Sequence, residues 1–411
     1  MRYKILALVI ITLFFASLVV QTHATLIWDI QIVDSSGDVG RNCSLALDSS
    51  GNPHTAYYDQ SQGDLRYIKW TSSGWSGQIV DSAGDVGSYC SLALDSSGNP
   101  HVSYYDQTNG YLKYATCSGS SWSTQTVDSE GDVGRFNSIA IDSTGKPYIS
   151  YFDYSHKALK YATLNGESWV IETVDYGEGT VGYGTSIKLD ANGYPHIAYY
   201  KTYNGDLKYA VKVGSTWATE TADDGGTTGV VGEYPSLALG SDGNPHIAYY
   251  DDTNGDLKYA TNSGSTWITQ TVDSQGQVGC YGTSIVLDSN GNPGIAYYDH
   301  TNGNLKYANW TGSMWSFQVI DSSADVGMYA SVVLGTQNSP HISFYDVSNA
   351  DLKYAEMKEE VPATPTPTPS PSTTASPSPT PTQTPASETP TAPPTTTTNP
   401  QQTEDFPLVY I

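Results

Sequence analysis

Three loops of this chain carry aromatic and acidic side chains that could hold a polar ligand. Tyrosine rings stack on the apolar faces of sugars, and carboxylates accept hydrogen bonds from sugar hydroxyls. The predicted ligand-binding residues are Tyr176, Glu178, Tyr183, Asp224, Glu233, Tyr234 and Tyr281. Neutral drift of surface loops would give the same pattern, so the chemistry alone does not decide the role.

Loop length is what sets these three loops apart. From an aspartate to the next repeat's first serine, the offset is 11 residues for Asp175 to Ser186, 13 for Asp223 to Ser236 and 11 for Asp273 to Ser284. The other four offsets are 10 residues, and those loops share an Asp-Val-Gly sequence at Asp38, Asp85, Asp132 and Asp325. Function usually breaks the symmetry of a repeat, which favours the three longer loops as the site.

Catalytic and metal-binding patterns are weaker. Five histidines, at positions 54, 101, 196, 246 and 341, recur at one place in the repeat, which is typical of packing at a strand end. No Ser/His/Asp or Cys/His order stands out, and paired carboxylates carry no weight in so acidic a chain. We therefore assign no catalytic residue. No cofactor is expected, although loose aspartate and carbonyl oxygens could still bind calcium.

The elements that must position these loops follow from a repeat. Tryptophans at 28, 75, 122, 169, 217, 267 and 315 are spaced 47, 47, 47, 48, 50 and 48 residues apart. A period in this range indicates a unit that cannot bury its own apolar surface and must stack on copies of itself. The repeat therefore dictates the fold class.

Each repeat divides into four short runs of strand length, rich in aromatic and aliphatic residues and without helical spacing. In the fourth repeat these are residues 186–190, 196–200, 207–210 and 217–222. Pairs such as Asn109-Gly110 predict tight hairpins with left-handed central residues. Four antiparallel strands repeated seven times predict an all-β protein, a seven-bladed β-propeller in which each blade covers its neighbours' apolar faces.

The phase of the repeat predicts how the ring closes. A tryptophan-containing strand from Leu26 to Val33 precedes the first complete unit, which begins at Ser44. The last unit ends at Ala355 and has no tryptophan strand after it. We therefore expect the N-terminal strand to close the last blade. The repeated tryptophans and Tyr-Tyr pairs are interpreted as packing between blades.

The propeller is assigned to residues 25–360, and other segments flank it. Residues 1–24 have the basic start, apolar run and small residues of a signal peptide, with a retained membrane anchor as the alternative. Residues 361–403 are rich in Pro, Thr and Ser, which predicts a disordered, extended stalk. Residues 404–411 form a short apolar tail, either the true end or the start of a truncated anchor. We expect a secreted or cell-surface protein.

The charge balance limits the partners. There are 18 Lys and Arg against 42 Asp and Glu, a formal charge of -24. Such a surface repels nucleic acid and anionic lipid, so we expect neither nucleic-acid binding nor direct lipid binding by the propeller. A monomer is expected. Cys43 and Cys90 occupy equivalent positions in neighbouring repeats and could form a disulfide outside the cell.

The repeat resembles a known type of protein. Its second copy contains the segments 91–95 (Ser-Leu-Ala-Leu-Asp), 98–101 (Gly-Asn-Pro-His), 104–106 (Tyr-Tyr-Asp) and 112–115 (Leu-Lys-Tyr-Ala). This unit is similar to that of secreted or surface-exposed prokaryotic β-propeller proteins with Pro/Thr-rich stalks. The resemblance covers Leu26 to about Glu356. It implies the fold and display outside the cell.

Three functions remain open on this sequence. A binding or adhesion module that recognises glycan or protein on the acidic loop face is favoured. The second is a propeller enzyme, a glycoside hydrolase or polysaccharide lyase, acting on extracellular carbohydrate. The third is a structural component of the cell envelope. A fold does not by itself choose among them.

Overall fold

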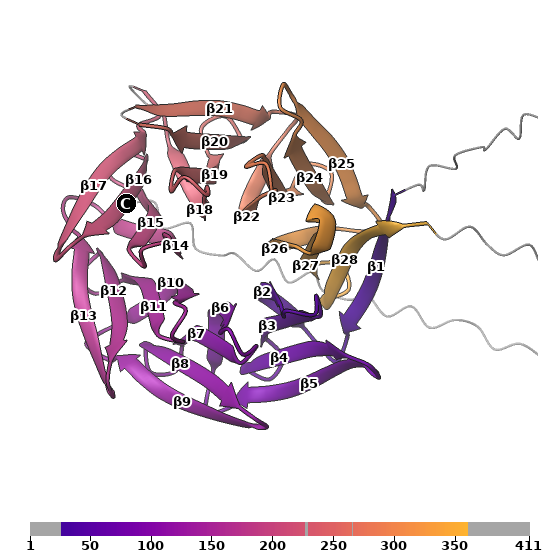
Figure 1. The fold of residues 1–411 in the computed structure, drawn as a ribbon, viewed down its shortest axis with the longest axis horizontal. Helices are drawn as coiled ribbons and strands as arrows, with labels where there is room; N and C mark the ends of the chain where they lie inside the picture. Colours follow the sequence, from indigo (N-terminus) through magenta and orange to yellow (C-terminus); the bar gives the residue numbers. More distant parts are fainter. Residues whose placement is uncertain (1–25, 227–228, 265, 361–411) are drawn as a thin grey trace, which may run out of the picture. The chain divides into compact units, whose positions relative to one another are not determined.

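Seven four-stranded antiparallel sheets surround a central axis, so the predicted seven-bladed β-propeller is confirmed (Figure 1). The structure, a computed structural model, describes residues 26–226, 229–264 and 266–360. The expected signal peptide (1–24), stalk (361–403) and apolar tail (404–411) lie outside these residues. No helix in the described ranges is long and apolar enough to cross a membrane.

The blades follow one another along the chain, each running from its inner to its outer strand. The first three consist of β2 (Val39–Leu47), β3 (Pro53–Asp59), β4 (Asp64–Thr71), β5 (Gly74–Asp81); β6 (Val86–Leu94), β7 (Pro100–Asp106), β8 (Tyr111–Ser118), β9 (Ser121–Asp128); β10 (Val133–Ile141), β11 (Pro147–Asp153), β12 (Ala158–Asn165) and β13 (Ser168–Asp175).

Blades four to six have the same order. They consist of β14 (Val181–Leu189), β15 (Pro195–Lys201), β16 (Asp206–Val213), β17 (Thr216–Asp223); β18 (Val231–Leu239), β19 (Pro245–Asp251), β20 (Asp256–Asn262), β21 (Trp267–Asp273); β22 (Val278–Leu287), β23 (Pro293–Asp299), β24 (Asn304–Trp310) and β25 (Trp315–Asp321). The second strand of each blade is almost entirely buried, as expected for a strand covered on both faces.

The seventh blade joins the two ends of the propeller. It contains β26 (Val326–Leu334), β27 (Pro340–Asp346) and β28 (Asp351–Glu359), with one turn of 3-10 helix, η1 (Thr336–Asn338), between the first two. Its outer strand is β1 (Leu26–Asp34), which pairs antiparallel with β28 from Leu26 opposite Glu359. The predicted closure by the N-terminal strand is therefore confirmed, and β2 lies against β26 across the junction.

The repeated tryptophans pack between blades, as interpreted from the sequence. Each packs edge-on against a tyrosine of the preceding blade, as Trp122 does on Tyr67 with ring centroids 5.1 Å apart. Each indole N–H also donates to a side chain on the preceding outer strand, as Trp122 does to Gln78 at 2.8 Å. The same pair of contacts joins Trp75 to Tyr354 and Gln31 of the last blade. Each indole therefore contributes both buried apolar surface and a hydrogen bond to the junction between blades.

A second repeated contact joins the inner strands. The backbone N–H of a strand residue donates to the serine hydroxyl of the preceding blade at 2.9–3.2 Å. The seven donor and acceptor pairs are Leu92–Ser44, Ile139–Ser91, Ile187–Ser138, Leu237–Ser186, Ile285–Ser236, Val332–Ser284 and Leu45–Ser331. The last pair crosses the closure, so the ring of bonds is complete.

One local expectation held only in part. The Asn-Gly pairs lie in hairpins between the second and third strands, but the loop between β7 and β8 has four residues, and within the Asn109-Gly110 pair only the glycine has a positive φ, 75°. The amide of Asn109 instead donates to Asp106 Oδ1 at 3.0 Å. The aspartate at the strand end therefore organises the turn, which the dipeptide alone did not indicate.

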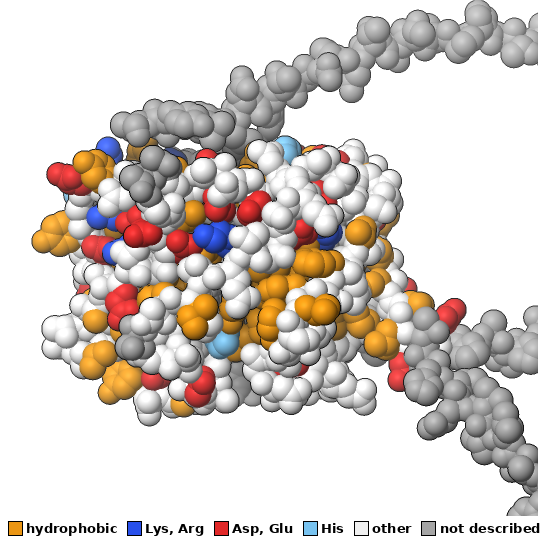
Figure 2. All heavy atoms as spheres, turned by 90° about the horizontal axis from the view of Figure 1, so that it is seen from above, with side chains coloured by type: hydrophobic (Ala, Val, Ile, Leu, Met, Phe, Trp, Pro, Cys, Tyr) orange, Lys and Arg blue, Asp and Glu red, His pale blue; other side chains and the backbone are white. Residues whose placement is uncertain are grey.

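The rim of the ring is formed by the outer strands. Acidic and basic side chains mingle over part of this surface, and hydrophobic side chains form a band over another part (Figure 2). Ile79 and Ile268 on outer strands are 53% and 51% exposed. The middle of each outer strand therefore contributes little to the core, whereas the tryptophan near its start and a buried residue near its end, such as Val80 or Val127, pack into it.

Deletion of residues 26–34 from the full chain should lower the melting temperature by about 10 °C or more. It removes Trp28, which packs on Tyr307, and the Gln31 acceptor of Trp75. Differential scanning calorimetry measures the loss, and a synthetic 26–34 peptide added in excess should restore part of it. An unchanged transition would mean that the last blade is stable with three strands.

Candidate functional site

Two sets of loops lie together on one face of the propeller. In every blade, a backbone N–H of the loop before the inner strand donates to a Ser or Thr hydroxyl of the loop between the second and third strands. Asp85 to Thr108 and Gln277 to Thr301, both 2.7 Å, are examples. The three longer loops singled out in the sequence therefore open on the same face as the Tyr-Asp loops. We call this face the loop face.

The inner strands carry an unusual backbone conformation near the loop face. Six blades place a residue other than glycine at positive φ, between 50° and 58°, at a bulge in the inner strand. These residues are Asn42, Tyr89, Phe136, Tyr234, Tyr281 and Tyr329. In the fourth blade Gly184 takes this conformation, at 61°, and the aromatic residue is its neighbour Tyr183. A bulky residue held there costs on the order of 1–3 kcal/mol.

Six aromatic side chains from these positions gather near the axis, and we call them the aromatic collar: Tyr89, Phe136, Tyr183, Tyr234, Tyr281 and Tyr329. The ring centroids of Tyr89 and Phe136 are 4.4 Å apart, and those of Phe136 and Tyr183 are 4.1 Å apart. Tyr234 and Tyr281 form a second group at 6.1 Å. All six side chains keep part of their surface exposed.

Phenol groups of the collar from different blades influence one another's pKa values. Burial raises the pKa of Tyr329 to about 12, with further contributions from Tyr89 and Tyr281. Burial also raises the pKa of Tyr183, with contributions from Tyr89 and Glu233. Residues from separate blades thus share one polar and aromatic environment.

The Asp-Val-Gly loops and the longer loops differ in their hydrogen bonds. In four blades the second residue of the aromatic pair on the second strand is a tyrosine that donates to the Asp-Val-Gly aspartate of the next blade, as Tyr298 does to Asp325 at 2.6 Å. The longer loops have no aspartate at that position. Tyr200 and Tyr250 have no hydrogen bond of this kind to any residue that the structure describes. Burial raises the pKa values of both phenols, and the charge of the nearby Glu233 adds to the rise.

Glu233 is the acidic residue of this region. It lies beside Tyr234 on β18 and opposite Tyr250 on β19. Burial raises the pKa of Glu233 to about 7, and the charge of Asp252 adds to the rise. A carboxyl group that titrates near neutral pH can bind a cation when ionised or donate a hydrogen bond when protonated.

The structure brings together four of the seven predicted site residues. Tyr183, Glu233, Tyr234 and Tyr281 belong to the collar or border it. The other three, Tyr176, Glu178 and Asp224, lie on exposed loop segments, and Tyr176 is 77% exposed. No contact joins these three to the collar within the described ranges.

Other collar residues were missed at the sequence level. They are Tyr89, Phe136 and Tyr329, which follow loops of ordinary length and so do not stand out by loop length. A signal was present. In four repeats an aromatic residue stands two places before the inner-strand serine, as Tyr89 does before Ser91.

The histidines and cysteines take structural roles. Each of the five repeated histidines contacts a tyrosine hydroxyl of its own blade through Nδ1, as His54 does with Tyr67. All four cysteines are described, and all are buried free thiols, so the suggested Cys43–Cys90 disulfide is absent. Cys43 and Cys90 each donate to the backbone carbonyl of a neighbouring blade at 3.1 Å. Among described residues, no group of three His, Cys, Asp or Glu side chains is placed to hold a metal ion.

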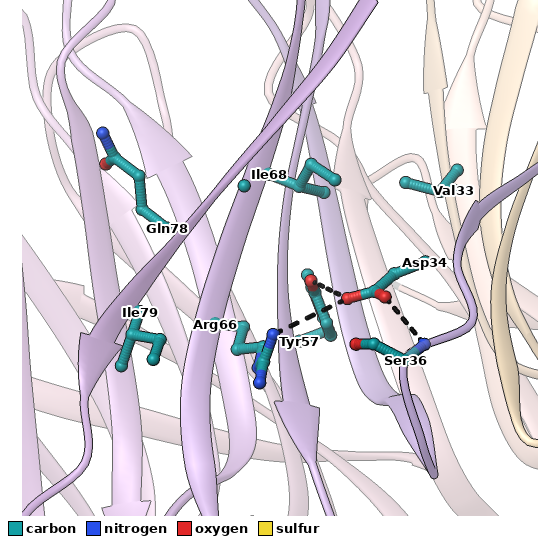
Figure 3. Close-up of a pocket in the computed structure, with 9 residues that line it drawn as sticks. Val33, Asp34, Ser36, Tyr57, Arg66, Ile68, Gln78 and Ile79 are labelled. Carbon is teal, nitrogen blue, oxygen red and sulfur yellow. Dashed lines mark hydrogen bonds and ion pairs between the residues drawn. The ribbon is translucent and has the colours of Figure 1, made fainter.

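A cavity of about 300 Å³ lies away from the axis, between β1 and the first blade (Figure 3). Asp34 accepts from the Tyr57 phenol at 2.7 Å and from the Ser36 amide at 3.0 Å. Arg66 lies 2.7 Å from Asp59 and 4.0 Å from Asp34. These polar groups are engaged with one another, and none is a predicted site residue. The collar is therefore the better candidate site.

The comparisons with known proteins support the fold. A solved ulvan lyase, described as a new family of polysaccharide lyase and bound to -[GlcA(1-4)Rha3S]-, is 12% identical, covers 75% of this chain and 90% of its own, and has a TM-score of 0.53. The polysaccharide lyase Uly1 is 10% identical, with 80% and 91% covered and a TM-score of 0.50. A protein of unknown function from Dyadobacter fermentans DSM 18053 is 11% identical, with 80% and 98% covered and a TM-score of 0.52.

No known family pattern and no curated protein sequence matches the chain. At identities this low, the likeness to solved structures shows the fold alone. Fold and site together define a seven-bladed β-propeller with an aromatic collar at its axis.

The free energy of unfolding should depend on the protonation state of Glu233. The pKa of Glu233 is raised in the folded state from 4.5 to about 7, so the folded protein binds the proton more tightly and stability falls as pH rises from about 4.5 through 7. Glu233→Gln removes this charge. We expect equal melting temperatures at pH 5 and a variant more stable by about 2–4 °C at pH 8.

Glu167→Gln is the matched control, because Glu167 is exposed on the β12–β13 turn. This substitution removes the same formal charge and should leave the pH dependence unchanged. Parallel melting curves for Glu233→Gln and the wild type from pH 5 to 8 would contradict the assigned environment of Glu233.

Proposed function

We propose that this protein is an extracellular carbohydrate-binding module that recognises a glycan at the aromatic collar on its loop face. The observation that carries the proposal is the backbone strain at the collar. Five aromatic residues are held at positive φ where glycine would cost less, as Gly184 demonstrates in the fourth blade. Backbone strain of this kind is retained where the side chain that it positions has a functional role.

The chemistry of the collar suits sugars. Partly exposed tyrosine rings offer stacking surfaces, and the hydroxyls of Tyr200 and Tyr250 with the carboxyl of Glu233 supply both donors and acceptors. Two solved propellers with TM-scores of at least 0.50 are named as polysaccharide lyases, which makes carbohydrate a natural class of ligand to test first. The predicted export signal and Pro/Thr-rich stalk would present the loop face outside the cell.

An enzyme acting on polysaccharide is the second candidate. The raised pKa of Glu233, about 7, is suited to general acid or base catalysis, and several phenols lie beside it. Release of reducing ends or unsaturated products from a polysaccharide would identify the enzyme.

A glycan array probed with the full chain tests the proposal, with and without calcium. Tyr234→Gly and Tyr281→Gly should each lower binding by at least about tenfold, because they remove a stacking ring. Both variants should stay folded, because glycine relieves the positive φ at these positions and offsets part of the ring packing that is lost. Tyr176→Ala, in an exposed loop, is the control and should bind normally.

Two results would contradict this function. Binding that is lost in Tyr176→Ala and kept in both collar variants would place the site at the loop tips. A wild-type protein that binds no glycan, with calcium or without it, would favour the structural envelope role.

A further inference from the structure

The positive charges near the collar are already neutralised. Arg41 Nε and Nη2 donate to Asp38 at 3.1 and 2.9 Å, and Arg135 makes the same pair of bonds to Asp132 at 3.2 and 2.8 Å. Each guanidinium also lies over a tyrosine ring, as Arg41 does over Tyr345 at 5.4 Å. These arginines are therefore committed to holding neighbouring loops, and they are poorly placed to recruit an anionic ligand.

The acidic group at the collar is not neutralised by an ion pair of this kind. Glu233 forms no ion pair with any Lys, Arg or His of the described chain, and its charged neighbour is another carboxylate, Asp252. Tyr234 follows Glu233 in β18, and Tyr250 lies opposite it on β19. The charge of Glu233 adds to the effect of burial in raising the pKa values of Tyr183, Tyr234 and Tyr250. The uncompensated charge at the collar is therefore negative, and it lies beside aromatic side chains.

The propeller uses this combination for its own cations. The ammonium of Lys258 lies 5.5 Å from the centroid of Tyr249 and 2.5 Å from the carboxylate of Asp223. Lys306 has the same arrangement, 5.4 Å from Tyr297 and 2.5 Å from Asp273. A ring face and a carboxylate together are a good environment for an ammonium group. At the collar both a carboxylate and aromatic side chains are present, and no Lys, Arg or His of the described residues forms an ion pair with Glu233.

We propose that the collar binds a glycan through a positively charged amino group, so that the ligand is an amino sugar whose ammonium lies between Glu233 and the tyrosine rings. This inference rests on the proposed carbohydrate-binding function and makes it specific. Neutral N-acetylated sugars would offer the same ring faces without the charge. Uronic acids would bring a second negative charge next to Glu233 and Asp252.

Calorimetric titration of the full chain at pH 7 tests the inference, with glucosamine tetramer and N-acetylglucosamine tetramer as ligands. We expect the glucosamine tetramer to bind at least about tenfold more tightly, and Glu233→Gln to remove this difference. Glu167→Gln, which changes the same charge away from the loop face, should keep it. The titrations are repeated in 0.5 M NaCl, because a formal charge of -24 attracts any oligocation and added salt screens that attraction.

The outcomes distinguish the amino-sugar inference from the glycan-binding function on which it rests. Equal affinity for both tetramers, with or without Glu233, would overturn the amino-sugar inference and leave the glycan-binding function standing. A preference that disappears in 0.5 M NaCl, or that Glu167→Gln also removes, would equally overturn it. Binding of tetramethylammonium or spermidine that depends on Glu233, without binding of either tetramer, would assign the collar to a free organic cation and overturn the saccharide part.

Discussion

One hydrogen bond, repeated at all seven blade junctions, fixes the ring on which the rest of this molecule depends. An inner strand is the edge of its sheet, and its free backbone N–H groups must find acceptors. Each inner strand satisfies one of them with the serine hydroxyl of the preceding blade, and Leu45 does so with Ser331 across the closure at 3.0 Å. Because each junction has the same bond, the blades are held in one register around the axis.

That register also positions the collar. The threonine two places after a collar tyrosine can donate its hydroxyl to the collar carbonyl of the preceding blade, as Thr185 does to Phe136 at 2.9 Å and Thr283 to Tyr234 at 2.8 Å. The carbonyl of the strained residue is therefore bound by the next blade. This hydrogen bond stabilises a backbone conformation that an isolated strand would not keep. Interblade bonding and the presentation of aromatic rings are consequences of the same geometry.

Much of the fold could be predicted from the sequence because the repeat reports packing directly. Trp75 and its equivalents mark one unit per blade, and the unpaired strand around Trp28 indicated the closure. The site was only partly predictable. Glu233 and Tyr234 were found through loop length, but Tyr89 lies in a loop of ordinary length and was missed.

The collar was missed for a physical reason. Tyr89 and Tyr183 converge because each inner strand has a bulge and a residue with positive φ. The residue types at these positions do not by themselves favour a bulge or a positive φ. The Asn-Gly turns were predicted only in part for a related reason, since the side chain of Asp106 organises the turn from outside the dipeptide. The position of a residue that depends on another blade, or on residues flanking a turn, could not be predicted from one segment of the sequence alone.

Amide hydrogen exchange of the native full chain, resolved by residue, tests the central claim most directly. If one continuous ring of bonds holds the blades, the Leu45 amide at the closure should be protected as strongly as the equivalent amides of Leu92 and Leu237. Rapid exchange at Leu45, with strong protection at the other two, would show that the first and last blades separate and would contradict a closed ring.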